Sequence, residues 1–124
     1  MEKSNPVLDK SFQFAVHIVE VHRHLTNERK EFVLSKQLLR SGTSVGANVH
    51  EAQAAQTKPD FIAKMSIASK EARETLYWLN LLKETAYLNA QAPQNTALIS
   101  QCHELNKLLT SIVKTAQENL KNTK

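Results

Sequence analysis

The chain has 124 residues and a mass of 14.0 kDa, which is enough for one domain with a single modest core. Its formal charge of +4 and pI near 9.3 are compatible with a nucleic-acid partner but do not require one. One cysteine, Cys102, excludes an intramolecular disulfide. With no secretory leader and no apolar run of roughly 18–20 residues, we expect a cytoplasmic protein with no membrane contact.

The composition favours helices throughout. The chain has two glycines and three prolines, 6% of its residues are aromatic, and no stretch shows the alternation of a strand. Apolar residues recur at spacings of three and four, which predicts helices at about 8–26, 32–56, 58–88 and 94–120. Such helices with short connections predict an all-α fold, an antiparallel up-and-down four-helix bundle, with residues 1–124 as a single domain.

Residues 8–26 carry two apolar stripes side by side. The first contains Phe12, Ala15, Val19 and His22, and the second contains Phe14, Ile18, Val21 and Leu25. A helix in a monomeric bundle needs one broad stripe, so the surplus predicts a further buried surface. The segment at 58–88 shows a similar surplus, and a homo-oligomer is its simplest explanation.

Residues 32–56 contain the stretch "LLRSGTSVGANVHEA", which holds both glycines, Gly42 and Gly46. A phosphate-binding loop needs G-x-x-x-x-G-K-[ST] after a strand, whereas here the spacing is G-x-x-x-G and no lysine follows. One arc of a helix instead collects Leu34, Leu38, Ser41, Val45, Val49 and Ala52. We therefore expect the glycines in mid-helix, where each costs roughly 1 kcal/mol against alanine and is tolerated if a neighbouring backbone packs closely.

The segment at 58–88 begins with a capping pattern, in which Thr57 is the expected N-cap and Pro59 and Asp60 follow in the first turn. Steps of four and three then connect Phe61, Met65, Ala68, Ala72, Thr75, Leu79, Leu82 and Ala86. The segment at 94–120 repeats this spacing with Leu98, Cys102, Leu105, Leu109, Ile112 and Ala116. Such seams are typical of helices that pack together along their length.

A polar face adjoins the apolar arc of residues 32–56. Helical geometry places Arg40, Ser44, Asn48 and Glu51 within about 80° of each other. The next segment offers Glu71 and Glu74 as ion-pair partners for Arg40. We interpret these six residues as a partly buried polar network that fixes helix register or a subunit contact. A catalytic acid–base pair is the alternative, but no nucleophile or set of metal ligands accompanies it.

Histidine spacing argues against a metal centre. His17 and His24 are seven residues apart, and none of the five histidines completes H-x-x-x-H, C-x-x-C or E-x-x-H. The paired E-x-x-H motif of di-iron bundles is missing as well. We expect neither a metal nor a cofactor.

Basic residues fall in two places. Lys107, Lys114 and Lys121 recur every seven residues and therefore form a ridge along the last helix. Arg23, Arg29 and Lys30 cluster around the first turn of the chain. Both groups could be ordinary solvated faces, or they could contact the phosphates of a nucleic acid without reading its sequence.

The motifs "LLRSGTSVGAN", "EAQAAQ", "DF" and "KEARETLYWL", in this order, make the chain resemble the four-helix-bundle proteins encoded in bacterial 23S rRNA intervening sequences. The resemblance covers essentially the whole chain. It implies a bundle that assembles into a ring-like homopentamer and is related to the accessory proteins of diversity-generating retroelements, which bind a reverse transcriptase and nucleic acid through basic surfaces. It implies no catalysis, and it marks as signature positions Arg40, Ser41, Ser44, Asn48, Glu51, Glu71, Glu74 and Trp78.

Two hypotheses for function follow. In the first, the protein is a non-enzymatic oligomeric bundle that binds RNA, or a nucleic-acid-handling protein, through its basic surfaces. In the second, it is a protein-interaction scaffold without a nucleic-acid role, and its surplus apolar stripes mediate assembly. An enzyme acting through Arg40, Asn48 and Glu51 is a remote third option, which would require an open pocket at those side chains.

Overall fold

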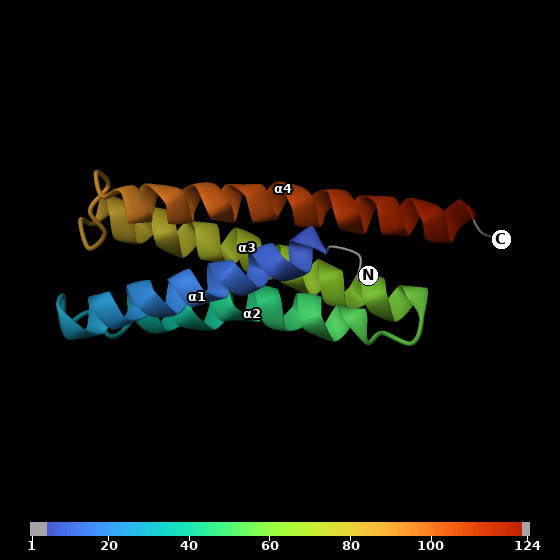
Figure 1. Ribbon diagram of the computed structural model, residues 1–124, viewed down its shortest axis with the longest axis horizontal. Coiled ribbons are helices and arrows are strands. Elements are labelled where there is room, and N and C mark those ends of the chain that lie inside the picture. Colours follow the sequence, from blue (N-terminus) through green and yellow to red (C-terminus); the bar gives the residue numbers. More distant parts are fainter. Residues whose placement is uncertain (1–4, 123–124) are drawn as a thin grey trace.

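The computed structural model describes residues 5–122, which form four α-helices (Figure 1). The helices are α1 (Pro6–Asn27), α2 (Leu34–Gln53), α3 (Lys58–Glu84) and α4 (Pro93–Asn122). Each helix packs against the next one in the chain, and α1 also packs against α4. The all-α, up-and-down four-helix arrangement predicted from the sequence is therefore confirmed.

Side-chain caps begin α1 and α3. Asn5 Oδ1 accepts the N–H of Leu8 at 3.3 Å and Pro6 takes the first helical position, so α1 starts at Pro6 rather than at residue 8. At α3, Thr57 Oγ1 accepts the N–H of Asp60 at 3.1 Å, which confirms the predicted N-cap.

The helix α2 is shorter at both ends than the predicted 32–56. A carboxylate outside the helix caps its start, because Glu31 accepts the N–H of Val33 at 3.3 Å and that of Ser35 at 2.8 Å. Phe32 and Val33 consequently lie ahead of the helix, and both side chains are exposed.

The helix α3 ends at Glu84, four residues before the predicted residue 88. Ala86 adopts a left-handed conformation with φ of 65°, and the N–H groups of Tyr87 and Leu88 both turn back to the Leu82 carbonyl, at 2.9 and 3.1 Å. Ala86 therefore lies exposed beyond the helix, and its predicted place in the apolar seam is wrong. Leu88 is buried although it lies outside any helix.

The predicted apolar stripes supply the core. Its largest buried apolar side chains are Phe14, Ile18, Leu25, Leu38, Val45, Val49, Met65, Leu79, Leu82, Leu98, Leu105 and Leu109. The first stripe of α1 behaves differently, because Phe12 is 55% exposed. Phe12 is therefore available to contact another molecule rather than being part of the core.

Both glycines lie in the middle of α2 and are buried against α1. A Cβ at Gly42 would approach Ile18 Cγ1 to 2.8 Å, and a Cβ at Gly46 would approach the carbonyl oxygen of Ser11 to 3.1 Å. The close-packing interpretation of the G-x-x-x-G pattern is confirmed, and the two glycines set how near α1 and α2 can come.

Candidate functional site

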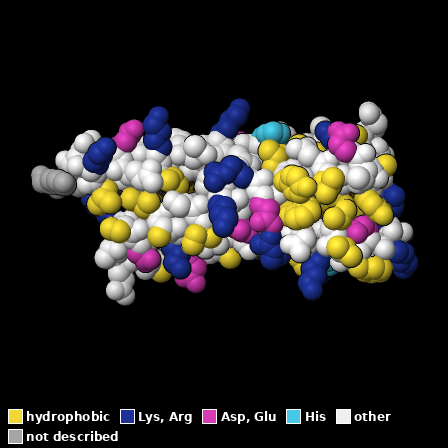
Figure 2. All heavy atoms as spheres, turned by 180° about the vertical axis from the view of Figure 1, so that it is seen from behind, with side chains coloured by type: hydrophobic (Ala, Val, Ile, Leu, Met, Phe, Trp, Pro, Cys, Tyr) yellow, Lys and Arg dark blue, Asp and Glu magenta, His cyan; other side chains and the backbone are white. Residues whose placement is uncertain are grey.

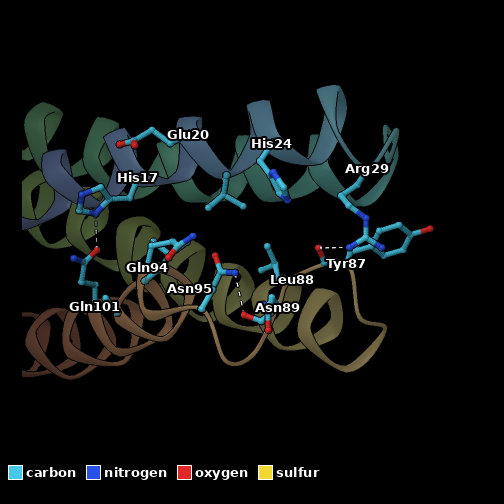
Figure 3. Close-up of a pocket in the computed structure, with 14 residues that line it drawn as sticks. His17, Glu20, His24, Arg29, Tyr87, Leu88, Asn89, Gln94, Asn95 and Gln101 are labelled. Atoms are coloured by element: carbon cyan, nitrogen blue, oxygen red, sulfur yellow. Dashed lines mark hydrogen bonds between the residues drawn. The ribbon is translucent and has the colours of Figure 1, made fainter.

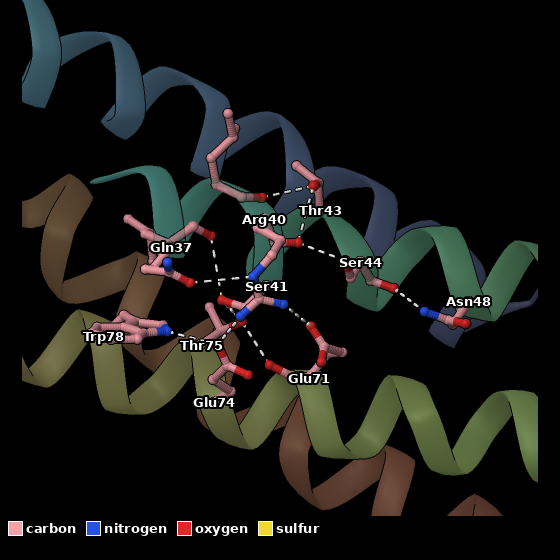
Figure 4. Close-up of polar contacts among 12 residues, drawn as sticks. Gln37, Arg40, Ser41, Thr43, Ser44, Asn48, Glu71, Glu74, Thr75 and Trp78 are labelled. Atoms are coloured by element: carbon pink, nitrogen blue, oxygen red, sulfur yellow. Dashed lines mark hydrogen bonds and ion pairs between the residues drawn. The ribbon is translucent and has the colours of Figure 1, made fainter. Parts of the chain in front are cut away.

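The polar cluster between α2 and α3 centres on Arg40 (Figure 4). Its Nη1 pairs with Glu71 Oε2 at 3.1 Å, and its Nη2 pairs with Glu74 Oε2. The Glu71 side chain is only 12% exposed, whereas that of Arg40 is 48% exposed. One half-exposed guanidinium thus balances two carboxylates, one of them largely removed from water.

Neighbouring side chains hold these charges in place. Trp78 Nε1 donates to Glu74 Oε2 at 2.9 Å, and Gln37 Oε1 accepts from Arg40 Nε at 3.3 Å. Directly beneath, Thr75 Oγ1 donates to Ser41 Oγ at 3.0 Å, and both hydroxyls are buried. The cluster therefore ties α2 to α3 at one longitudinal register.

Three of the six residues predicted for this network do not reach α3. Ser44 donates to the Arg40 carbonyl at 2.6 Å and Asn48 to the Ser44 carbonyl at 2.8 Å, so both bond the backbone of their own helix. Glu51 is exposed one turn farther along α2. The interhelical network is smaller than predicted, because short side chains in mid-helix bond the carbonyl four residues earlier.

The predicted lysine ridge lies on the outer surface of α4, where Lys107, Lys114 and Lys121 are all exposed. Seven residues span about 10 Å of helix, so the three lysines cover about 21 Å. Lys10 of α1 pairs with Glu104 at 3.0 Å, about one turn before the ridge begins. The ridge is a line of separated charges on one helix.

The second basic group lies at the other end of the bundle, where α1 ends and α4 begins, so the two groups do not merge into one surface (Figure 1). Arg23 and Lys30 are exposed there. Arg29 is exposed too, but its Nη1 donates to the carbonyls of Ala86 and Tyr87 at 3.0 and 3.1 Å. Its guanidinium also lies 5.2 Å from the centre of the Tyr87 ring. Arg29 therefore clamps the α1–α2 connection onto the α3–α4 connection.

A groove of about 650 Å³ opens between the C-terminal half of α1 and the N-terminal half of α4 (Figure 3). At one end, His17 Nδ1 and Gln101 Oε1 are 2.9 Å apart and bridge the two helices. At the other end lie Arg29 and Tyr87. One weak sequence signal points to this groove: the seven-residue spacing that places His17 and His24 on one face of α1.

Cys102 is buried in α4, and its Sγ donates to the Ala72 carbonyl at 3.5 Å. Burial strips the thiolate of water and raises the pKa of Cys102 to about 12. A thiol with such a pKa stays protonated at neutral pH and is a poor nucleophile.

Between residues 5 and 122 the structure brings together no cluster of three or more His, Cys, Asp or Glu side chains that could hold a metal ion. Within the same range, none of the four helices combines the length and the hydropathy that crossing a bilayer requires.

Comparison with known proteins identifies the fold family. The chain is similar to a protein of unknown function of the S23 ribosomal protein family from Bacteroides thetaiotaomicron VPI-5482, with 55% identity and a TM-score of 0.83. The similarity covers 87% of this chain and 98% of that one. No curated protein matches. The family model described as "23S rRNA-intervening sequence protein" matches residues 3–111. The chain therefore belongs to the 23S rRNA-intervening sequence protein family.

Proposed function

We propose that this protein is a non-enzymatic helical bundle that binds RNA through the phosphate backbone, with Lys107, Lys114 and Lys121 as the main contacts. The observation that carries the proposal is that these three exposed lysines align on one face of α4, and that none has an ion-pair partner among residues 5–122. Charges left unpaired in a row are available to displace counterions from a phosphate backbone. The matched family is named after a segment of 23S ribosomal RNA, so this RNA is the first one to test as a partner.

Such contacts position the RNA but do not read its sequence, so the protein should discriminate by shape and charge. Arg23 and Lys30 are exposed at the far end of the bundle and would extend the contact where the RNA is long enough. Arg29 contributes in a different way, because one of its nitrogens is already committed to two carbonyls.

The test is a filter-binding titration against a structured RNA between about 50 and 200 mM salt. Three phosphate contacts predict a loss of affinity of roughly 40-fold over this range, from the slope of about 0.9 per contact. Replacing Lys107, Lys114 and Lys121 with glutamate should abolish most of the binding and flatten the salt dependence. A matched triple exchange at the exposed Lys36, Lys58 and Lys70, which lie on α2 and α3, keeps the same net charge change and should retain the salt slope.

Equal loss of binding in the two triple variants would show that net charge alone matters, and would reject the ridge. Binding that is absent from the wild-type protein at the lowest salt would reject the RNA function itself.

A second candidate is a protein-interaction scaffold, and a specific observation favours it. Phe32, Val33 and Tyr77 are 59%, 72% and 60% exposed, which is unusual for large apolar side chains. Figure 2 shows hydrophobic side chains gathered on one half of the face it presents. A homo-oligomer, a pentamer if the protein follows the family resemblance, would cover such a surface, and it is compatible with either function.

A further inference from the structure

The groove between α1 and α4 has the size and the lining of a small-molecule site. Its volume of about 650 Å³ lies within the roughly 300–1,000 Å³ of typical ligand pockets. Its floor is apolar: Val21 and Ala92 are half-buried, Ala97 is exposed, and Leu88 and Leu98 are buried beneath them. A flat apolar body could lie on this floor without displacing any side chain of the core.

Arg29 gives the groove a fixed positive end. The Nη1 atom is held by two carbonyls and the guanidinium plane is held by the Tyr87 ring. Within residues 5–122, Nε and Nη2 make no hydrogen bond, so their N–H groups remain free for an acceptor. Because the guanidinium is already immobilised, an anion that binds it loses less side-chain entropy than at a mobile arginine.

The rest of the rim offers neutral hydrogen-bonding groups. His24 and Gln94 point into the space between the helices (Figure 3), and within the described residues neither side chain makes a hydrogen bond. Glu20 also lines the groove, but it lies at the His17 end, away from Arg29. The groove is thus positive at the Arg29 end, apolar in the middle and negative at the Glu20 end, with hydrogen-bonding groups along its side.

We propose that this groove holds one unpaired nucleotide, with its base on the apolar floor formed by Val21, Ala92 and Ala97 and its phosphate at Arg29. The arrangement of charge matches a nucleoside monophosphate, which has one anionic end and a planar body with polar edges. Arg23 and Lys30 are exposed and directly adjoin the groove residues His24 and Arg29 in the chain. They would meet the phosphates of the neighbouring nucleotides in an RNA strand. A base within a duplex stack could not enter, so the groove selects single-stranded or flipped-out residues. This inference rests on the proposed RNA function, and its experiment is designed to fail separately from it.

The first arm of the test detects the site directly. Nuclear magnetic resonance spectra of the ¹⁵N-labelled protein are recorded during titration with AMP or UMP, and in parallel with inorganic phosphate. The nucleotides should shift the amide signals of Leu88, Asn95 and Ala97, while the lysine ridge stays unchanged. Shifts of the same size with inorganic phosphate would mean that the groove binds an anion only, and would overturn the inference.

The second arm uses variants and the anisotropy of a fluorescent, unstructured single-stranded RNA. Ala97 is exposed on α4 and lines the groove, so Ala97→Trp fills the groove without changing any charge. Arg29→Gln removes the anion contact. Arg29→Gln should bind the RNA roughly tenfold more weakly, which corresponds to one lost charge-assisted contact. Ala97→Trp should weaken binding by a similar factor, because the indole occupies the place of the base. Arg73→Gln, at an exposed α3 arginine that bonds Ser69, is the matched control and should bind like the wild type.

Since Arg29 also clamps the loops, Ala97→Trp is the decisive variant. Wild-type affinity for single-stranded RNA in Ala97→Trp would overturn the groove while leaving the lysine ridge intact. A change in oligomeric state on Ala97→Trp would overturn it too, by showing that a second copy occupies the groove. Conversely, groove shifts with AMP in a protein that binds no RNA would support the nucleotide site and reject the RNA function.

Discussion

At the scale of single residues, the glycines of α2 explain how a helix can contain two residues that disfavour helices. Each glycine saves the volume of one Cβ where α1 crosses, and the space is already occupied by Ile18 in one case and by the Ser11 carbonyl in the other. The loss of helix propensity is thereby offset by close contact between the two helices. The same stretch that resembles a phosphate loop in its composition is a contact surface in the fold.

We expect Gly42→Ala to lower the free energy of unfolding by about 1–3 kcal/mol, because the new methyl group overlaps Ile18. Propensity alone would raise it by roughly 1 kcal/mol. Urea denaturation followed by circular dichroism measures the unfolding free energy of the variant and of the wild type. Ala47→Gly, at an exposed position of the same helix, calibrates the propensity contribution. The double variant Gly42→Ala/Ile18→Ala should recover part of the loss relative to the sum of the single changes, and strict additivity would contradict the proposed overlap.

At the scale of helices, periodicity predicted which faces are buried much better than where helices end. The N-cap at Thr57 could be predicted because its pattern is local. The end of α3 could not, because the left-handed residue there is Ala86, where glycine or asparagine is the usual sequence signal. The cap of α2 by Glu31 was also missed, because the usual sequence pattern has a glutamate inside the first turn, whereas Glu31 lies before the helix begins.

Arg40 is the side chain on which the α2–α3 contact depends most for its electrostatics. Arg40→Ala leaves Glu71, which is largely buried, and Glu74 without their cation. We expect a loss of about 1–2 kcal/mol in unfolding free energy, measured in urea. The loss should shrink at high salt, because Arg40 is half exposed.

Arg73→Ala is the matched control for this change. Arg73 lies exposed on α3 and bonds Ser69 at 3.1 Å, so its removal should alter stability by about 0.5 kcal/mol or less. If Arg40→Ala and Arg73→Ala lower the unfolding free energy equally, the ion pairs of Arg40 add nothing to stability beyond a surface hydrogen bond.

At the scale of the whole molecule, the groove and the clamp on it arise from contacts that no short segment contains. Arg29 reaches carbonyls 57 and 58 residues away, and His17 meets a glutamine 84 residues away. Periodicity places residues on a face of one helix but says nothing about the angle between α1 and α4. The bundle could therefore be predicted from the sequence, whereas the groove could be found only in the assembled fold.

The exposed apolar side chains predict a defined assembly. The helices α2 and α3 run in opposite directions and are held in register by Ser41 and Thr75. Val33, two turns before Ser41, therefore lies on the same side of this contact as Tyr77, which follows Thr75. We expect one oligomer larger than a monomer in native mass spectrometry and light scattering. Val33→Glu/Tyr77→Glu should dissociate it without loss of helix content, because both side chains are exposed in the single chain.

Phe12→Glu tests the specificity of that surface, since Phe12 is exposed on α1 and its ring lies 6.3 Å from that of His50, at a tilt of 56°. It should leave the assembly intact. A wild-type protein that is monomeric at micromolar concentration would remove the homo-oligomer from both proposed functions.

The helix α4 continues to Asn122, well beyond residue 111, where the match to the family ends. Leu109 is its last fully buried side chain among the described residues, yet Lys114 and Lys121 both follow it. The family match therefore ends before Lys114 and Lys121, which form most of the surface proposed to bind RNA. Ile112 and Val113 pack against the core, whereas Lys114 and Lys121 are exposed. The charge of those final turns can therefore change by mutation while the packing of the bundle is kept.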